Sequence, residues 1–275
     1  MLMFRLAFLL PGLLGLYGCV HVRLDAASLL SADQRPETAR LEAGYRIEQG
    51  IIVDDGRVVG ITRAYRAGNR VVILFCGGDS FRRSRDGGVV LQALALDADV
   101  VLFDYPGFGD STGTPTPENL VNAGRAVHRF IAGLPGTAQQ RLVVYGFSLG
   151  GLVAAQLARH VSTDGVVLEA TAPDISTWVR TQVPWYAAPF VRVHLDDSLA
   201  SVDGVRPLRS FAGRVLLLAG GSDQRAPASL SRDYYLRLRS AGVKASLVIV
   251  PGAAHGGIHR SDRFRTALRQ FLADL

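Results

Sequence analysis

The sequence predicts an α/β fold, with a doubly wound, mostly parallel sheet of eight strands. Short runs that are apolar at nearly every position recur from residue 71 onward, which is typical of parallel strands buried on both faces. Longer amphipathic stretches alternate with these runs, and this alternation implies right-handed crossovers. The 275 residues are 48% apolar and 20% charged, an ordinary globular composition with ample material for one large domain.

We expect the sheet to open with a hairpin, because residues 45–53 and 57–63 are β-rich and flank an Asp55-Gly56 turn. The six later strands are expected at residues 71–75, 100–103, 142–145, 166–168, 215–219 and 245–250. Helices are expected at residues 117–131, 149–160, 228–241 and 260–275. These elements place the folded domain at residues 44–275.

Residues 171–213 interrupt the alternation between two predicted strands. Loops of this length inside a compact domain are usually functional. The segment contains Trp178, Trp185 and Tyr186, and we interpret it as a small helical lid over the site. The alternative, a surface loop whose aromatic residues only stabilise the fold, explains the same residues equally well.

The first 18 residues predict a secretory signal peptide. Arg5 is the only charge, and the apolar run at residues 6–16 is shorter than a membrane-spanning helix. The following Leu16-Tyr17-Gly18-Cys19 resembles a bacterial lipoprotein box. This resemblance implies that Cys19 becomes the lipidated first residue and that residues 19–43 form a tether.

A lipidated Cys19 implies a membrane-anchored protein of the bacterial cell envelope that faces the periplasm. The alternatives are secretion and an uncleaved N-terminal anchor in the inner membrane. The net charge of +6 comes from arginines scattered along the chain. This pattern predicts no nucleic-acid partner and only a general attraction to anionic surfaces. Two cysteines are too few for a disulfide framework or a four-thiolate metal site.

A buried strand at residues 142–145 leads into Gly146-Phe147-Ser148-Leu149-Gly150 and then into a helix. A serine on such a strained strand-to-helix turn projects its hydroxyl above the sheet, and the flanking glycines avoid a backbone clash. The helix N-terminus favours developing negative charge there. We therefore predict that Ser148 is a nucleophile; a tight structural turn is the alternative.

A serine nucleophile needs a base and an acid that orients the base, in the chain order Ser, Asp or Glu, His. His255 follows the last strand directly, in a Gly-rich loop at the carboxyl end where such sheets place their sites. Asp223 follows residues 215–219 in the same way and is the predicted orienting acid. The rival carboxylates are Glu169 and Asp174. The rival histidines are His160, His194 and His259.

The oxyanion of an acyl-transfer reaction needs backbone N–H donors. We predict that these are Leu149, which follows the nucleophile, and Gly78, in the loop after residues 71–75. Cys76 is interpreted as a small residue at a strand end rather than a second nucleophile, because no basic partner is assigned to it. A carboxylate at Asp79 would oppose the oxyanion, so we expect its side chain to point away.

From about residue 44 to the C-terminus, the chain resembles the α/β-hydrolase superfamily, and within it the serine-aminopeptidase-like, BEM46/ABHD13-type hydrolases. The resemblance is carried by Phe103-Asp104-Tyr105-Pro106-Gly107-Phe108-Gly109-Asp110-Ser111, Gly146-Phe147-Ser148-Leu149-Gly150-Gly151, Leu168-Glu169-Ala170 and Gly220-Gly221-Ser222-Asp223. The chain departs from the family at Cys76, where His is usual, and at Pro106, where Arg is usual.

The resemblance and the residues together imply a serine hydrolase that cleaves carboxylic ester, thioester or amide bonds of a small acyl-containing substrate through an acyl-enzyme. Ser148, His255 and Asp223 would carry the reaction, and no metal or organic cofactor is required. The second hypothesis is a catalytically inactive envelope scaffold or binding protein of the same fold, since fold alone does not secure function.

Overall fold

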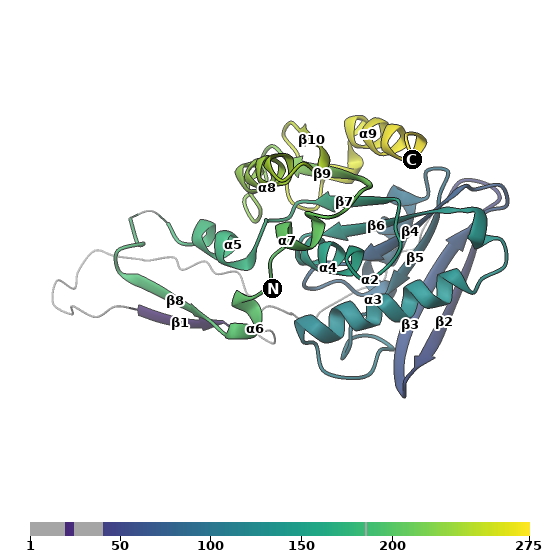
Figure 1. Cartoon of the computed structure of the whole chain (residues 1–275), viewed down its shortest axis with the longest axis horizontal. Coiled ribbons are helices and arrows are strands. Elements are labelled where there is room, and N and C mark those ends of the chain that lie inside the picture. Colours follow the sequence, from purple (N-terminus) through teal and green to yellow (C-terminus); the bar gives the residue numbers. More distant parts are fainter. Residues whose placement is uncertain (1–19, 25–40, 185) are drawn as a thin grey trace.

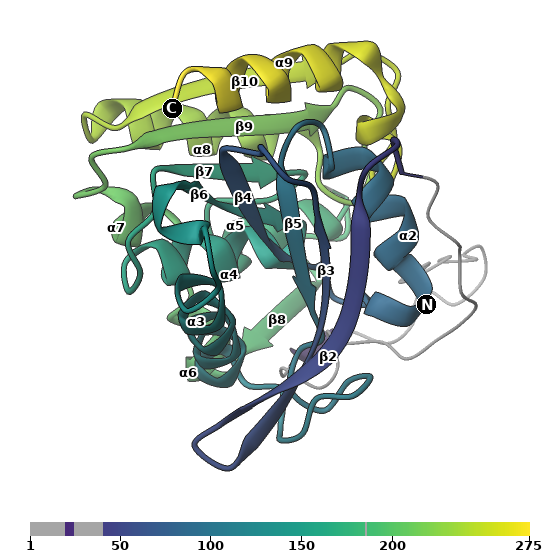
Figure 2. The same ribbon diagram turned by 90° about the vertical axis from the view of Figure 1, so that its right-hand side faces the viewer.

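The computed structural model describes the main chain of residues 20–24 and all of residues 41–184 and 186–275. An eight-stranded sheet runs through the body of the molecule in the order β10-β9-β7-β6-β4-β5-β3-β2 (Figures 1 and 2). The strands from β10 to β5 are mutually parallel, and β3 runs antiparallel to its neighbours β5 and β2. The predicted α/β class and mostly parallel sheet are confirmed.

The predicted strands form close to their expected positions. They are β2 (Arg46–Asp54), β3 (Arg57–Tyr65), β4 (Val71–Cys76), β5 (Asp99–Phe103), β6 (Arg141–Phe147), β7 (Gly165–Glu169), β9 (Arg214–Gly220) and β10 (Lys244–Val250). The hairpin between β2 and β3 turns at Asp55 and Gly56, which both have positive φ angles of 48° and 73°. Two successive residues of this kind are the mark of a type I′ turn, which matches the twist of the strands.

Helices cover both faces of the sheet. On one face, α3 (Pro117–Ala132), α4 (Leu149–Ala158) and α8 (Ala228–Ser240) enclose a core that contains Val144 and Leu217. On the other, α2 (Arg83–Leu94) and α9 (Asp262–Ala273) enclose a core that contains Tyr145 and Leu216. Neighbouring strand residues therefore point into different cores, as the alternation of side chains along a strand requires.

Helix α2 is absent from the sequence prediction. It begins with charged residues, has Gly87 and Gly88 in its middle, and its N-cap Arg82 makes no side-chain capping bond. Each of these features opposes a helix when the segment is considered alone. Burial of Leu91 and Leu94 against the sheet stabilises the helix instead.

Strand β4 lies at the point where the winding of the sheet reverses. The chain passes from β4 through α2 to β5 on one side, and β4 also pairs with β6 on its other side. In open α/β sheets, ligand sites form outside the carboxyl ends of the strands at such a switch point. The carboxyl ends of β4 and β6 lead directly to Gly77 and Ser148.

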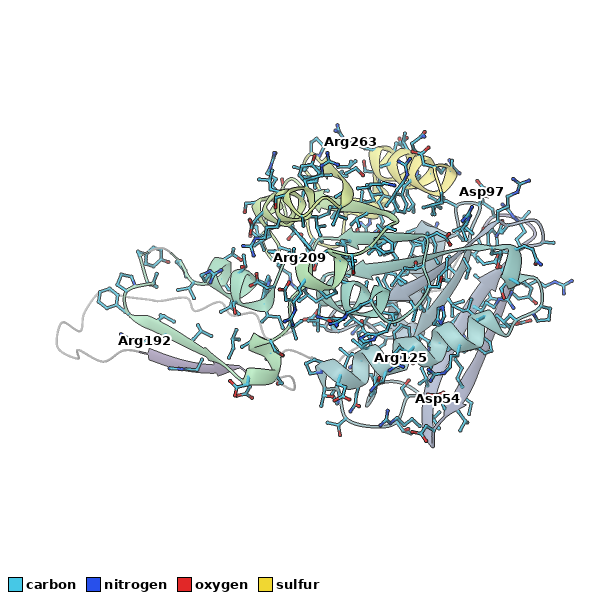
Figure 3. The ribbon with its side chains drawn as sticks, viewed as in Figure 1. Asp54, Asp97, Arg125, Arg192, Arg209 and Arg263 are labelled. Carbon is cyan, nitrogen blue, oxygen red and sulfur yellow. The ribbon has the colours of Figure 1, made fainter. Side chains whose placement is uncertain are left out.

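The predicted lid at residues 171–213 contains α5 (Ile175–Gln182), α6 (Asp197–Ala200) and α7 (Val205–Leu208), and also a strand, β8 (Val191–Leu195). Strand β8 pairs in parallel with β1 (Val20–Leu24), so part of the predicted tether is a strand. The two strands form an arm beyond the body of the molecule (Figure 1). Arg192 of β8 lies on this arm, away from Asp54 and Arg125 of the body (Figure 3).

Trp185, the predicted signal peptide at residues 1–18 and the predicted lipidation site Cys19 lie outside the described residues. Among the residues that are described, no helix has both the length and the apolar character needed to cross a bilayer.

Candidate active site

Ser148 occupies a sharp turn between β6 and α4. Its φ and ψ angles are 54° and −121°, a conformation that residues other than glycine rarely adopt. Its N–H donates to the Glu169 carbonyl oxygen at 2.8 Å, which ties the turn to the end of β7. A Cβ atom on Gly146 would collide with the Gly150 backbone, and one on Gly150 would collide with the Cys76 carbonyl. The flanking glycines are therefore required, as the sequence predicted.

His255 reaches Ser148 from the loop that follows β10. Its Nε2 atom lies 3.0 Å from Ser148 Oγ, and its Nδ1 atom lies 2.7 Å from Asp223 Oδ2. The Phe147 ring packs beside the imidazole, with the ring centroids 5.0 Å apart. With its proton on Nδ1, the imidazole donates to Asp223 and leaves Nε2 as an acceptor for the serine hydroxyl.

Asp223 follows β9 and has a fully buried side chain. Its Oδ1 atom accepts the backbone N–H groups of Arg225 at 2.8 Å and Ala226 at 2.9 Å, while Oδ2 faces His255. Both carboxylate oxygens thus have hydrogen-bond partners, which offset the cost of burying this polar group. The side chains of the three predicted residues, Ser148, His255 and Asp223, thus form one hydrogen-bonded line.

The two rival carboxylates are engaged elsewhere. Asp174 caps α5 through the Thr177 N–H at 2.6 Å and pairs with Arg237 at 3.1 Å. Glu169 Oε2 accepts the Tyr145 hydroxyl at 2.5 Å, and Oε1 has no hydrogen-bond partner among the described residues. Burial raises the pKa of Glu169 to about 7; the Tyr145 hydrogen bond opposes this rise and the nearby charge of Asp223 adds to it.

The remaining predicted alternatives lie apart from this line of hydrogen bonds. His160 follows the end of α4 and is exposed, His194 is exposed on β8, and His259 lies in a short 3-10 turn before α9. Cys76 is completely buried, and this burial raises the pKa of its thiol. A buried, protonated thiol is a poor nucleophile, so Cys76 acts as a small core residue at the end of β4.

The predicted oxyanion loop lies against the serine. A Cβ atom on Gly78 would be 3.5 Å from Ser148 Cβ, so this loop approaches the nucleophile closely. Leu149 is the first residue of α4, where a backbone N–H has no partner within the helix. The Asp79 carboxylate pairs with Arg225 at 3.1 Å. The Asp79 side chain therefore points toward the loop that carries Asp223. We expected it to point away from the oxyanion, and this direction is compatible with that expectation.

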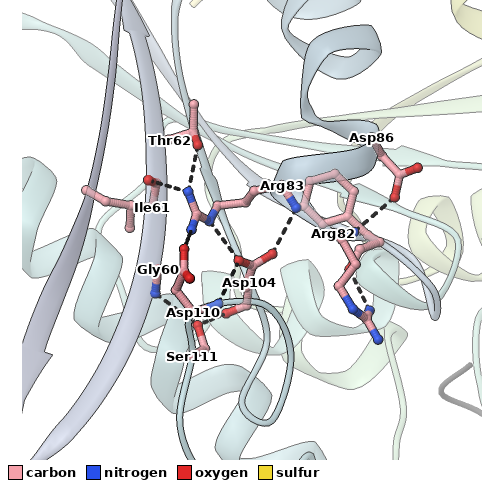
Figure 4. Close-up of polar contacts among 10 residues, drawn as sticks. Gly60, Ile61, Thr62, Arg82, Arg83, Asp86, Asp104, Asp110 and Ser111 are labelled. Carbon is pink, nitrogen blue, oxygen red and sulfur yellow. Dashed lines mark hydrogen bonds and ion pairs between the residues drawn. The ribbon is translucent and has the colours of Figure 1, made fainter. Parts of the chain in front are cut away.

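A buried ionic cluster beneath this loop was not predicted from the sequence (Figure 4). Arg83, at the start of α2, binds Asp104 through Nε at 2.9 Å and through its backbone N–H at 2.9 Å. Its guanidinium also donates to the Ile61 carbonyl at 2.6 Å and pairs with Asp110 at 2.5 Å. Arginine is the side chain suited to satisfying several acceptors at once, because its guanidinium has five fixed donors.

This cluster positions the loop after β5, and that loop in turn supports the oxyanion loop. Ser111 Oγ donates to the Asp104 carbonyl at 2.7 Å and accepts the Gly60 N–H at 2.9 Å. The buried Tyr105 hydroxyl donates to the Gly77 carbonyl at 2.9 Å, next to Gly78. In the sequence, the motif from Asp104 to Ser111 is the feature that could have predicted this supporting role. No sequence pattern marks its buried partner Arg83.

A cavity of about 400 Å³ extends along α4 from Leu149, the residue that follows Ser148. Its lining includes Leu149, Leu152 and Val153 of α4, Leu120 of α3 and Leu199 of α6. Polar and charged side chains, among them Glu118, Arg125 and Arg206, complete the lining, and the described aromatic residues of the predicted lid do not take part in it. Trp178 packs with Leu230 and donates its Nε1–H to the Arg225 carbonyl at 2.9 Å.

Comparisons with known proteins agree with this architecture. The sequence model of the alpha/beta hydrolase fold family matches residues 69–201, a span that includes Ser148 but neither Asp223 nor His255. An uncharacterised protein of Mycobacterium tuberculosis is 30% identical over 210 residues, which are 75% of this chain and 71% of the relative.

Two further relatives have descriptive names. Protein bem46 of Schizosaccharomyces pombe is 28% identical over 182 residues, covering 66% of this chain and 59% of the relative. The phosphatidylserine lipase ABHD16A of Rattus norvegicus is 29% identical over 171 residues, covering 60% of this chain but only 29% of the lipase. Among solved structures, an esterase of Pyrococcus furiosus superposes with a TM-score of 0.68 at 14% identity, covering 88% of this chain and 99% of the esterase.

Replacement of Arg83 by methionine should lower the free energy of unfolding by about 3–5 kcal/mol, because it leaves the buried Asp104 carboxylate without its charge partner. Urea denaturation measures the loss. The matched control is Arg129→Met, which removes a pair with Asp54 whose side chains are 53% and 32% exposed and should cost under about 1 kcal/mol. Equal losses in the two variants would contradict this account.

The raised pKa of Glu169 should make stability depend on pH. From pH 4.5 to about 7 the unfolded chain loses the Glu169 proton while the folded chain keeps it. The free energy of unfolding therefore falls as the pH rises through this window. Between pH 4.5 and about 7, the free energy of unfolding of Glu169→Gln should rise relative to that of the wild type by up to about 3 kcal/mol. Denaturation at several pH values measures this difference. A difference between Glu169→Gln and wild type that stays constant over this pH range would be the contrary result.

Proposed function

We propose that this chain, which belongs to the α/β-hydrolase superfamily, is a serine hydrolase that cleaves carboxylic ester, thioester or amide bonds through an acyl-enzyme. The observation that carries the proposal is the hydrogen-bonded line from Ser148 through His255 to Asp223. A base within hydrogen-bond reach of a hydroxyl, itself oriented by a buried carboxylate, is the arrangement that makes serine nucleophilic at neutral pH.

In the acylation half of the reaction, Ser148 Oγ attacks the substrate carbonyl carbon while His255 Nε2 takes the hydroxyl proton. Asp223 holds the imidazole in the required tautomer and stabilises the imidazolium that forms. The negative charge on the substrate oxygen is met by the N–H groups of Leu149 and Gly78, near the N-terminus of α4. Collapse of the tetrahedral intermediate expels the alcohol, thiol or amine, which receives the proton from His255.

Deacylation repeats these steps with water as the nucleophile. His255 accepts a proton from the water, which attacks the acyl carbon, and then returns a proton to Ser148 Oγ as the acid product leaves. The paired Asp79 carboxylate contributes little opposing charge at the oxyanion, because Arg225 neutralises it at 3.1 Å.

Esters with an apolar acyl portion are the substrate class that we favour. The proteins that this chain is similar to include a phosphatidylserine lipase and an esterase. The cavity along α4 offers about 400 Å³, and its lining includes Leu149, the residue after the proposed nucleophile. Its aliphatic part, formed by Leu149, Leu152 and Val153, suits an acyl chain.

We further propose that the chain is anchored by lipid on Cys19 and faces the periplasm. The lipoprotein-like sequence before Cys19 supports this location. More than one acyl chain on the mature N-terminus would hold the protein stably on a membrane, since a single chain gives only marginal binding.

A fluorophosphonate probe should label the wild-type protein and fail to label Ser148→Ala. In the same preparation, Asp223→Asn should lower the rate of ester hydrolysis about 10⁴-fold, because the imidazole loses its oriented tautomer. Rates on p-nitrophenyl esters of increasing chain length and on aminoacyl anilides would assign the acyl length and the bond type. Folding of each variant is checked by circular dichroism.

Absence of labelling in folded wild-type protein would favour the second hypothesis, an inactive scaffold or binding protein of the same fold. Labelling that persists in Ser148→Ala would place the nucleophile elsewhere.

Replacement of Cys19 by serine should move the protein from the detergent phase to the aqueous phase in a phase-separation assay, because no lipid is then attached. The wild-type protein, expressed in the same cells, should remain in the detergent phase. Membrane attachment that survives the substitution would point to an uncleaved N-terminal helix.

A further inference from the structure

The outer end of the arm carries exposed aromatic side chains. Tyr186 is 59% exposed and Phe190 is 64% exposed, whereas most large apolar residues of the body are buried. Both lie in the segment between α5 and β8, and β8 begins at the end of the arm farthest from the sheet (Figure 1). The other exposed large apolar residues among those described are aliphatic and lie on β2 and α8: Ile47, Ile51, Val53 and Leu236.

The strand register places the start of β1 at the same end. Val20 pairs with Val191, and the two strands run in parallel from there toward the body. Phe190 immediately precedes Val191, and Cys19 immediately precedes Val20. The first residue of β1, which follows the proposed lipid attachment point by one position in the sequence, is therefore paired with the residue that follows Phe190.

Charge is distributed unevenly along β8. Arg192, near the outer end, is exposed. Asp196 and Asp197 follow the inner end of the strand, about 13 Å farther along at the usual rise of a strand. A cation at the outer end and carboxylates toward the body orient the arm favourably toward an anionic surface.

We propose that residues 186–192, the arm tip, form a membrane-docking surface that inserts Tyr186 and Phe190 into the headgroup region of the bilayer that holds the chain's N-terminus. This inference rests on the proposed lipid anchor at Cys19. Tyrosine and phenylalanine suit this depth, because their rings partition into the interface while the tyrosine hydroxyl remains hydrated. A second contact in addition to the anchor would fix the orientation of the protein relative to the membrane.

The test places one fluorescent probe at the arm tip and one far from it. Ala188→Cys puts a thiol between the two aromatic residues, and Leu236→Cys puts one on α8, where the native side chain is 63% exposed. The buried Cys76 does not compete for the label. Each full-length protein is labelled with a polarity-sensitive fluorophore and reconstituted, through its own N-terminus, into vesicles of phosphatidylethanolamine and phosphatidylglycerol with or without brominated acyl chains.

We expect brominated lipid to quench the probe at residue 188 about twofold or more, as for a group in the interfacial region, and to leave the probe at residue 236 unchanged. Adding Tyr186→Ser and Phe190→Ser should abolish the quenching at residue 188. Hydrolysis of a soluble short-chain ester, measured on the same samples, should be unaffected by the serine substitutions.

Three outcomes would overturn the docking surface: no quenching at residue 188 in vesicle-bound protein, equal quenching at both positions, or quenching that survives the serine substitutions. A blue shift without quenching would indicate a protein partner and would also overturn it. Protein that stays in the supernatant would refute the anchor and, with it, the docking. Loss of soluble-ester hydrolysis in every sample, by contrast, would refute only the proposed hydrolase activity.

Discussion

The positive φ angle at Ser148 is the constraint on which the proposed chemistry depends. A residue with a Cβ atom pays about 1–3 kcal/mol for such a conformation, so the surrounding structure must enforce it. The enforcement comes from close packing of Gly146 and Gly150 against neighbouring backbone and from the hydrogen bond between the Ser148 N–H and the Glu169 carbonyl. A relaxed turn would move the Ser148 hydroxyl away from His255. It would also break the hydrogen bond that the Glu169 carbonyl, at the end of β7, accepts from the Ser148 N–H.

The site joins loops from several strands, and hydrogen bonds and ion pairs connect those loops. Asp223 is held by two backbone N–H groups of its own loop, and Arg225 of that loop reaches across to Asp79 beside Gly78. The Arg83 cluster stabilises the loop after β5, whose Tyr105 hydroxyl holds Gly77. Removing the charge partner of the buried Asp104 is costly, so the Arg83 cluster favours one arrangement of the oxyanion loop over its alternatives.

Local sequence patterns predicted most of the sheet and three central side chains of the site. The apolar runs were recognisable because strands covered on both faces need no polar positions, and the Asp55-Gly56 turn because few residues adopt its backbone angles. Ser148, Asp223 and His255 were each identifiable because they directly follow a predicted strand. Helix α2 could not be predicted in this way, since its polar start and its glycines do not indicate a helix. Only its contacts with the sheet stabilise it.

The sequence by itself determined the eight strands of the main sheet, helices α3, α4, α8 and α9, the strained serine turn and the set of candidate acids and bases, because each depends on residues adjacent in the chain. Only the tertiary structure decided that Asp223 rather than Glu169 faces His255, that Asp79 pairs with Arg225, and that β1 pairs with β8. Those outcomes depend on distances between segments far apart in sequence, which the packing of the sheet and its helices sets.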